Sequence, residues 1–131
     1  MTIAGLARAG GVGVETVRFY QRRGLLGVPR RGDGMGRSGG IRRYGPAELG
    51  RLRFIKAAQR AGFTLDEVGA LIRLDATDDK AQVRAMAEAR LAALDVRIAE
   101  MQAARVALSH LSDACDASGA GPCPIIAAFG P

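Results

Sequence analysis

Cys115 and Cys123 are the only cysteines in this 131-residue chain, and an apolar stretch from Pro124 to Ile126 follows the second. Seven mostly small residues separate the two cysteines. Thiolates are soft ligands that prefer Cu(I), Ag(I), Hg(II) or Zn(II) to hard cations. The first residues lack the layout of a secretory signal, so we expect a cytoplasmic protein, in which stable disulfides are uncommon. The pair is therefore predicted to bind a metal ion or to take part in redox chemistry.

Charge is divided unevenly along the chain. Residues 1–63 contain 13 Lys and Arg against three acidic residues, whereas residues 64–131 contain six against ten. A basic half is expected to meet a polyanion such as nucleic acid. Hydrophobic residues make up 48% of the chain, enough for a folded core, and no apolar run approaches the roughly 18 residues of a membrane span. No membrane partner is expected.

Two short helices joined by a glycine-containing turn are predicted at the start of the basic half. The first spans residues 2–10, with Thr2 as its N-cap, and the second spans residues 14–24. This arrangement is typical of a helix-turn-helix motif. The second helix places polar side chains on its outward face: Glu15, Thr16, Arg18, Gln21 and Arg22.

A glycine-rich loop follows over residues 27–40 and leads into a short extended segment, residues 41–44. A loop that closes onto this segment would form a small hairpin, or wing, beside the helix pair. The wing would present groups that bind phosphate: Arg37, Arg42, Arg43 and Tyr44. The alternative interpretation is a solvated loop without that role.

Two further helices complete the predicted lobe. A third begins at Pro46, which suits a first helical turn, and ends at Gly62. A fourth begins after Thr64, where Glu67 completes a capping box. Both have apolar residues at helical spacing, which predicts a common core: Leu49, Leu52, Ile55, Leu65, Val68, Leu71 and Ile72.

The span from about residue 78 to residue 111 is different, because it contains no glycine or proline and is rich in alanine. Its apolar positions alternate in steps of four and three, with one interruption by Arg105: Ala87, Leu91, Leu94, Ile98, Met101 and Leu108. Such a heptad stripe predicts one long helix that packs against a partner helix. The same helix of a second chain is the expected partner, in an antiparallel or parallel pair. Packing back onto its own lobe is the alternative.

These segments together resemble the MerR family of bacterial transcription regulators. The resemblance rests on "VETVRFYQRRGLL", on "GGIRRYGPAELGRLRFIKAAQRAGFTLDEV", and on the tail "CDASGAGPCPII" after the long helix. It implies a mainly α fold with three parts: a winged helix-turn-helix lobe (1–75), an antiparallel coiled-coil dimerisation helix (76–112), and a C-terminal metal-binding loop and tail (113–131). It also implies a homodimer on palindromic promoter DNA, which is distorted for RNA polymerase when the effector binds.

The resemblance assigns roles to particular residues. It places residues of the second helix at the major groove: Glu15, Thr16, Arg18, Tyr20 and Arg22. It places three residues of the wing on the DNA backbone: Arg42, Arg43 and Tyr44. It makes Cys115 and Cys123 the metal ligands.

The residues leave two candidate groups for the metal: the monovalent ions Cu(I), Ag(I) and Au(I), and the divalent ion Hg(II). Relatives that sense mercury, zinc, cadmium or lead generally have a third cysteine at the start of the partner's dimerisation helix, where this chain has Lys80. Two thiolates alone favour linear coordination of Cu(I), Ag(I), Au(I) or Hg(II), and Lys80 could offset the negative charge of a Cu(I) bis-thiolate. The lobe is most similar to mercury-resistance regulators, whereas the seven-residue loop is similar to copper and gold sensors.

The same residues allow two other functions. A redox-sensing regulator could use a reversible disulfide between Cys115 and Cys123, and a small metal-buffering protein could carry the basic lobe without using it. The single histidine, His110, is predicted to stand near a helix C-terminus, where the dipole favours it. Met86 and Met101 are predicted to pack in the stripe. No nucleophile–base pair or carboxylate dyad has suitable spacing, so an enzyme is not expected.

Overall fold

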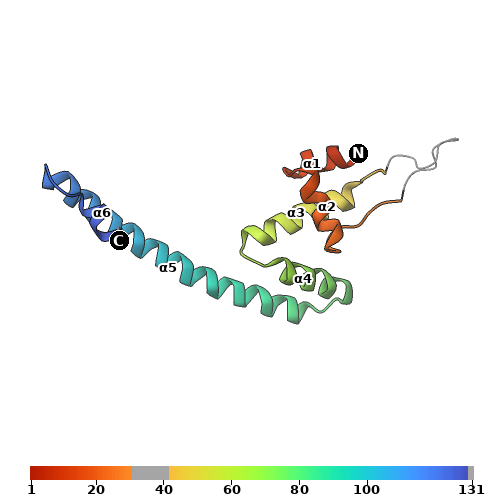
Figure 1. Cartoon of the computed structure of the whole chain (residues 1–131). Coiled ribbons are helices and arrows are strands. Elements are labelled where there is room, and N and C mark those ends of the chain that lie inside the picture. The colour runs from red at the N-terminus through yellow and green to blue at the C-terminus, as the bar shows by residue number, and fades with distance from the viewer. Residues whose placement is uncertain (31–41, 130–131) are drawn as a thin grey trace. The chain divides into compact units, whose positions relative to one another are not determined.

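The computed structural model describes residues 1–30 and 42–129. Regular structure within these residues is helical and includes no β-strand, which confirms the mainly α prediction. No helix within the described ranges is long and apolar enough to cross a membrane. Contacts divide the chain into two compact units, Met1–Arg90 and Leu91–Pro131. The helices in chain order (Figure 1) are α1 (Ile3–Gly10), α2 (Val14–Arg22), α3 (Pro46–Arg60), α4 (Leu65–Thr77), α5 (Lys80–Ser118) and α6 (Pro124–Phe129).

α1 and α2 form the predicted helix pair. Thr2 caps α1, where its Oγ1 accepts a hydrogen bond from the Gly5 N–H at 3.1 Å. Gly11 ends α1 with a φ of +70°, a left-handed conformation that glycine adopts without strain. α1 packs against α2 and α3, and Leu6 and Val17 are fully buried in the core that these helices share.

α3 and α4 begin at side-chain caps that the sequence contains. The Gly45 N–H donates to Glu48 Oε2 at 2.8 Å at the start of α3. The predicted capping box of α4 is confirmed: the Thr64 N–H donates to Glu67 Oε1 at 2.9 Å, and the Glu67 N–H donates to Thr64 Oγ1 at 3.1 Å. The two helices pack on each other and add fully buried residues to the core: Leu52, Ile55 and Val68.

α5 continues beyond the predicted helix end near residue 111 and reaches Ser118. Residues 112–118 contain no glycine or proline, so no residue in this segment favours stopping the helix. The next residue, Gly119, has a φ of +67° and leaves the helical conformation. Cys115 therefore lies inside α5, whereas the sequence placed it in a loop.

Candidate nucleic-acid interface and metal centre

The outward face of α2 carries most of the polar residues that the sequence assigns to DNA. Glu15 and Arg18 are exposed and form an ion pair at 3.4 Å, and Arg22 is also exposed. Thr16 is half-buried. An exposed pair three residues apart on a helix contributes at most about 0.5 kcal/mol. Arg18 can therefore exchange the Glu15 carboxylate for a phosphate at little cost.

Tyr20 lies on the opposite face of α2, which corrects its predicted place among the outward residues. Its side chain is 5% exposed, and its hydroxyl donates to Gln59 Oε1 on α3 at 2.6 Å. Burial raises the pKa of Tyr20. Helical spacing explains the position, because Tyr20 follows the buried Val17 by three residues and shares its face. Tyr20 thus joins α2 to α3, and its ring is not available to a DNA groove.

Phe19 is exposed on α2. The guanidinium of Arg23 lies over its ring at 5.8 Å and also pairs with Asp66 at 2.9 Å. Phe19 stands two residues from the buried Val17, and this offset turns it away from the core. This two-residue spacing from Val17 is the sequence signal that could have predicted the exposure of Phe19. An exposed ring among arginines can make an apolar contact with a base edge.

Tyr44 is buried at the base of the predicted wing, which corrects its assignment to the DNA backbone. Its side chain is 4% exposed, and its hydroxyl accepts a hydrogen bond from Gln21 Nε2 on α2 at 2.9 Å. Its N–H donates to the Met1 carbonyl at 2.7 Å, and the Met1 amino group donates to the Tyr44 carbonyl at 2.7 Å. These contacts fix the end of the wing segment to both α2 and the N-terminus.

The rest of the wing is known only in part. Residues 31–41, which include Arg37, lie outside the described residues. Arg43 is exposed and available to a phosphate, whereas Arg42 is half-buried and its Nε is buried without a hydrogen-bond partner. The prediction of a phosphate-binding wing therefore rests on Arg43 within the described part.

The two cysteines come together around the turn that joins α5 to α6. Cys115 lies in the last turns of α5, Cys123 directly precedes α6, and both are half-buried. Their sulfur atoms are 2.7 Å apart and are not joined by a disulfide. Gly119 and Gly121 both have positive φ, at +67° and +127°, which allows the short connection to reverse.

The pKa values of the two thiols move in opposite directions. The hydrogen bond with Cys123, burial and the charge of Cys123 raise the pKa of Cys115. The hydrogen bond from Cys115 lowers the pKa of Cys123, and backbone N–H groups of Ile126 and Ile125 lower it further. The arrangement therefore favours a thiolate at Cys123 that accepts a hydrogen bond from the Cys115 thiol.

The surroundings of the sulfurs are apolar on one side only. Pro124 and Ile125 are half-buried, whereas Ile126 is 71% exposed and does not form part of a closed wall. Across the described residues, no group of three or more His, Cys, Asp or Glu side chains could hold a metal ion. The donor set at this site is therefore two sulfurs.

The sequence matches two protein-family models in the regions just described. The model "MerR HTH family regulatory protein" covers residues 1–74, and the model "MerR, DNA binding" covers residues 49–111. The first alone spans more than half of the chain. This protein belongs to the MerR family.

Individual relatives agree along nearly the whole length of this MerR-family chain. The mercuric resistance operon regulatory protein of Shigella flexneri is 43% identical over 98% of this chain and 87% of its own length. The HTH-type transcriptional regulator CueR of Escherichia coli is 31% identical over 96% and 91%. A lead(II)-bound transcription regulator from Ralstonia metallidurans CH34 is 31% identical, with a TM-score of 0.68 over 99% of both chains. All three are named as regulators, and the predicted family is confirmed.

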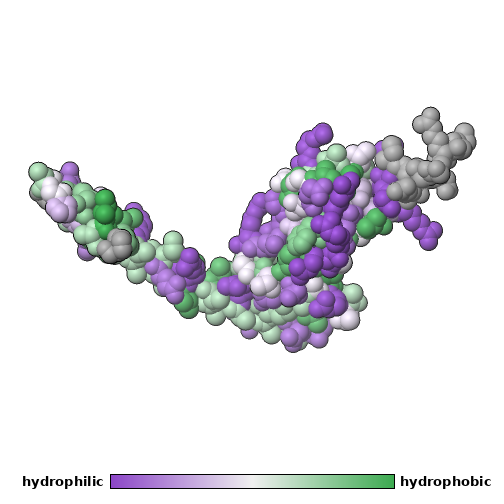
Figure 2. Space-filling view, viewed as in Figure 1, coloured by the Kyte–Doolittle hydropathy of each residue, from purple (hydrophilic) through white to green (hydrophobic). Residues whose placement is uncertain are grey.

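The apolar stripe of α5 is largely exposed to solvent in this MerR-family chain. Leu94 is half-buried, while the other large residues of the stripe are 46–58% exposed: Leu91, Ile98, Met101 and Leu108. Figure 2 shows hydrophobic residues on the surface of this segment. Because a single helix cannot bury such a stripe alone, it requires another surface.

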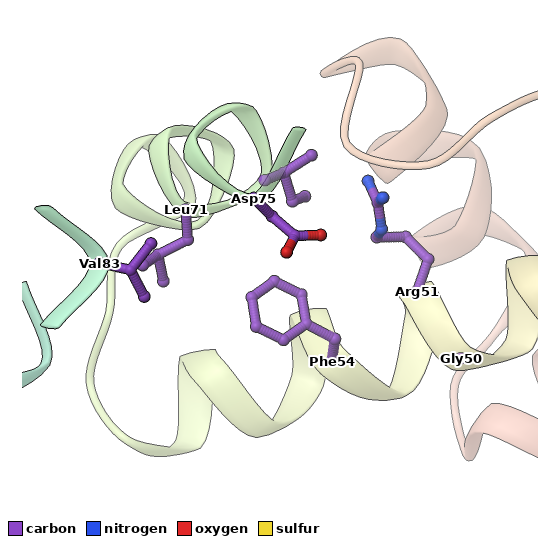
Figure 3. A pocket seen from close by; sticks show the side chains of 7 residues that line it. Gly50, Arg51, Phe54, Leu71, Asp75 and Val83 are labelled. Atoms are coloured by element: carbon purple, nitrogen blue, oxygen red, sulfur yellow. The ribbon is translucent and has the colours of Figure 1, made fainter. Parts of the chain in front are cut away.

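α3, α4 and the first turns of α5 surround a hollow of about 340 Å³. Figure 3 shows the ring of Phe54 at its centre, Leu71 and Val83 on one side, and Arg51 and Asp75 nearby. The lining contains neither cysteine nor histidine. The hollow therefore offers no ligands for a second thiophilic ion.

Proposed function

We propose that this chain is a metal-responsive transcription regulator that activates transcription when a thiophilic ion binds Cys115 and Cys123. The ion is Cu(I), Ag(I), Au(I) or Hg(II), each of which accepts two thiolates in a line. The similarity to a mercuric resistance regulator and to a lead(II)-bound regulator supports a metal as effector.

The convergence of two sulfurs at 2.7 Å carries this proposal. Two soft donors suit ions that bind linearly but do not satisfy Zn(II), which takes four ligands. Because a metal–sulfur bond is about 2.3 Å long, an ion cannot sit between sulfurs this close. Binding therefore widens the pair and shifts Cys123 relative to α5, which gives the metal a way to change the conformation of the protein.

Lys80 supports a monovalent ion if the dimer is antiparallel. Lys80 is the first residue of α5, and Cys115 lies near the other end of the same helix. An antiparallel pair of α5 helices would bring Lys80 of the partner subunit toward the cysteines. Its ammonium would offset the net negative charge of two thiolates around a monovalent ion, whereas Hg(II) with two thiolates is already neutral.

The basic lobe would bind double-stranded promoter DNA, and the α5 stripe would hold the homodimer. Exposed Arg18, Arg22 and Arg43 supply cations for phosphates on one side of the lobe. A dimer of such lobes matches a palindromic site, because the symmetry of the protein is repeated in the DNA. The bound DNA would be distorted to suit RNA polymerase, so that deformation is the regulated quantity.

The closeness of the sulfurs also favours a second function, a redox-sensing regulator. Oxidation by a peroxide would join Cys115 and Cys123 in a disulfide, with loss of two protons and two electrons to the peroxide, which is reduced to water. Disulfide sulfurs are about 2.05 Å apart, so a small approach would suffice.

Titration of the reduced full-length protein with Ag(I), Hg(II) and Zn(II) against a competing chelator tests both functions. We expect one Ag(I) or Hg(II) per cysteine pair, two sulfur neighbours per metal in X-ray absorption, and weaker Zn(II) binding. Cys115→Ser and Cys123→Ser should each abolish binding, whereas His110→Ala should leave it unchanged. Three or more sulfur neighbours, or a preference for Zn(II), would contradict the two-sulfur site. Induction by peroxide without metal would support the redox function instead.

A further inference from the structure

Arg90 of α5 reaches back to the turn between α3 and α4. Its Nη1 donates a hydrogen bond to the Gly62 carbonyl at 3.0 Å. Gly62 has a φ of +94° and lies just past the end of α3, where the helix dipole favours a cation. This hydrogen bond ties α5 to the turn that joins α3 to α4.

The contact is closely fitted. A Cβ atom at position 62 would lie 3.1 Å from Arg90 Cζ and 3.2 Å from Arg90 Nε, tighter than ordinary van der Waals contact. Glycine suits this position because its φ of +94° strains other residues, and a side chain here would also press on the guanidinium of Arg90. Arg90 Nε is buried and has no hydrogen-bond partner, and burial of this unpaired N–H reduces the net stability that the contact contributes.

Arg90 also lies beside the start of α4. The pKa of Glu67 is lowered first by its hydrogen bonds with the backbone and side chain of Thr64, and in smaller part by the charge of Arg90. Arg90 is the last residue of the first compact unit. It therefore stands where α5 leaves the DNA-binding lobe and touches the turn between two of the lobe's helices.

From Gly62 a chain of hydrogen bonds continues to α2. The Gly62 N–H donates to the Gln59 carbonyl at 2.9 Å. The Gln59 side chain accepts the hydrogen bond of Tyr20 at 2.6 Å. A displacement of the end of α3 would thus reach the helix that carries Arg18 and Arg22.

We propose that Arg90 is a positioning residue that fixes α5 to the α3–α4 turn and transmits a change in α5, through Gly62 and Gln59, to α2. This rests on the proposed function, because the change in α5 begins with metal at the cysteines. Arg90 is neither a metal ligand nor one of the residues assigned to DNA. Its substitution should therefore separate metal binding from the response of the lobe.

Hydrogen exchange on the full-length protein, with and without one equivalent of Ag(I), provides the test. In the wild type, Ag(I) should change the exchange rates of amides 59–65 and of α2. Arg90→Met should bind Ag(I) with unchanged affinity but lose this change, and its metal-free turn should exchange about tenfold faster, as expected for one hydrogen bond to a charged group. Arg90→Lys, which keeps a donor, should restore part of the response.

Arg84→Met is the matched control, because Arg84 lies on the same helix and pairs with Glu88 of that helix at 3.0 Å. It should behave as the wild type. The proposal is overturned if Arg90→Met keeps the full Ag(I) response, or if wild type that has bound Ag(I) shows no response at the turn. If the wild-type protein does not bind Ag(I), the proposed metal-responsive function fails, whatever the role of Arg90. If Arg90→Met and Arg84→Met show equal exchange without metal, the hydrogen bond from Arg90 to Gly62 does not hold the turn, and the proposal is overturned at this contact.

Discussion

At the scale of single residues, the cysteine pair combines two thiols whose ionisation is unequal. The pKa of Cys115 is raised, first by its hydrogen bond with Cys123, and the pKa of Cys123 is lowered, first by the same hydrogen bond. Metal ions bind thiolates, so the proton of Cys115 is the harder of the two for a metal ion to displace. Cys123 is therefore the more readily ionised ligand of the pair, and Cys115 is the less readily ionised one.

Metal affinity should therefore depend on pH in two stages. Between the lowered pKa of Cys123 and the raised pKa of Cys115, one proton is released per ion, and affinity falls about tenfold for each pH unit lost. Below both pKa values, two protons are released and the fall is steeper. Proton release measured during Ag(I) titration at several pH values checks this. Release of two protons across the whole range would show that the thiols ionise together.

The sequence predicted a site formed by the two cysteines, whose sulfurs do lie together, but it misplaced two tyrosines of the helix-turn-helix lobe. Two cysteines, a glycine-bearing connection and an expected cytoplasmic location were enough to predict a metal or redox pair. Tyr20 and Tyr44 were assigned to DNA although both are buried. The position of Tyr20 could have been deduced from its spacing to Val17. That of Tyr44 depends on pairing with Met1, 43 residues away, which no local pattern reveals.

At the scale of elements, the α5 stripe should hold two chains together. Replacing Leu94 and Ile98 by Glu should give monomers, because each buried Leu or Ile contributes about 1.5–3 kcal/mol and the loss occurs in both chains. Sedimentation of the purified variant measures this. Val96→Glu with Ala99→Glu places the same charges on the same helix away from the stripe and should remain dimeric. A dimeric Leu94 and Ile98 variant would show that the stripe is wrongly drawn.

Helix starts were more predictable than helix ends. Thr2 and Thr64 cap α1 and α4 through their own side chains, so that local residues determine where each helix begins. The predicted end of α5 near residue 111 is too early, because residues 112–118 contain no glycine or proline that would break the helix. Periodicity predicted one long helix and its apolar stripe, whereas the end of α5 is determined by the first glycine after it, Gly119.

At the scale of the whole molecule, the uneven charge should make DNA binding strongly dependent on salt. Arg18→Ala and Arg43→Ala should each weaken binding and reduce the slope of log affinity against log salt by about one, the value for one lost phosphate contact. Mobility shifts at several salt concentrations, on a duplex selected from a random library, measure the slope. Arg97→Ala is the control, because Arg97 lies on α5 and pairs with Glu100 at 3.6 Å. Unchanged slopes in both test variants would contradict the proposed interface.

The placement of the aromatic hydroxyls gives the molecule an internal optical reporter. The chain has no tryptophan and only two tyrosines, Tyr20 and Tyr44, both buried in the unit that carries α1–α4. Each hydroxyl is hydrogen-bonded to a glutamine side chain, Gln59 or Gln21. Near-ultraviolet circular dichroism and fluorescence excited in the tyrosine band therefore report on the lobe, while the cysteine unit contributes no tyrosine or tryptophan signal. A change in tyrosine emission on adding Ag(I) would show, without any attached label, that an event at the sulfurs has reached the DNA-binding helices.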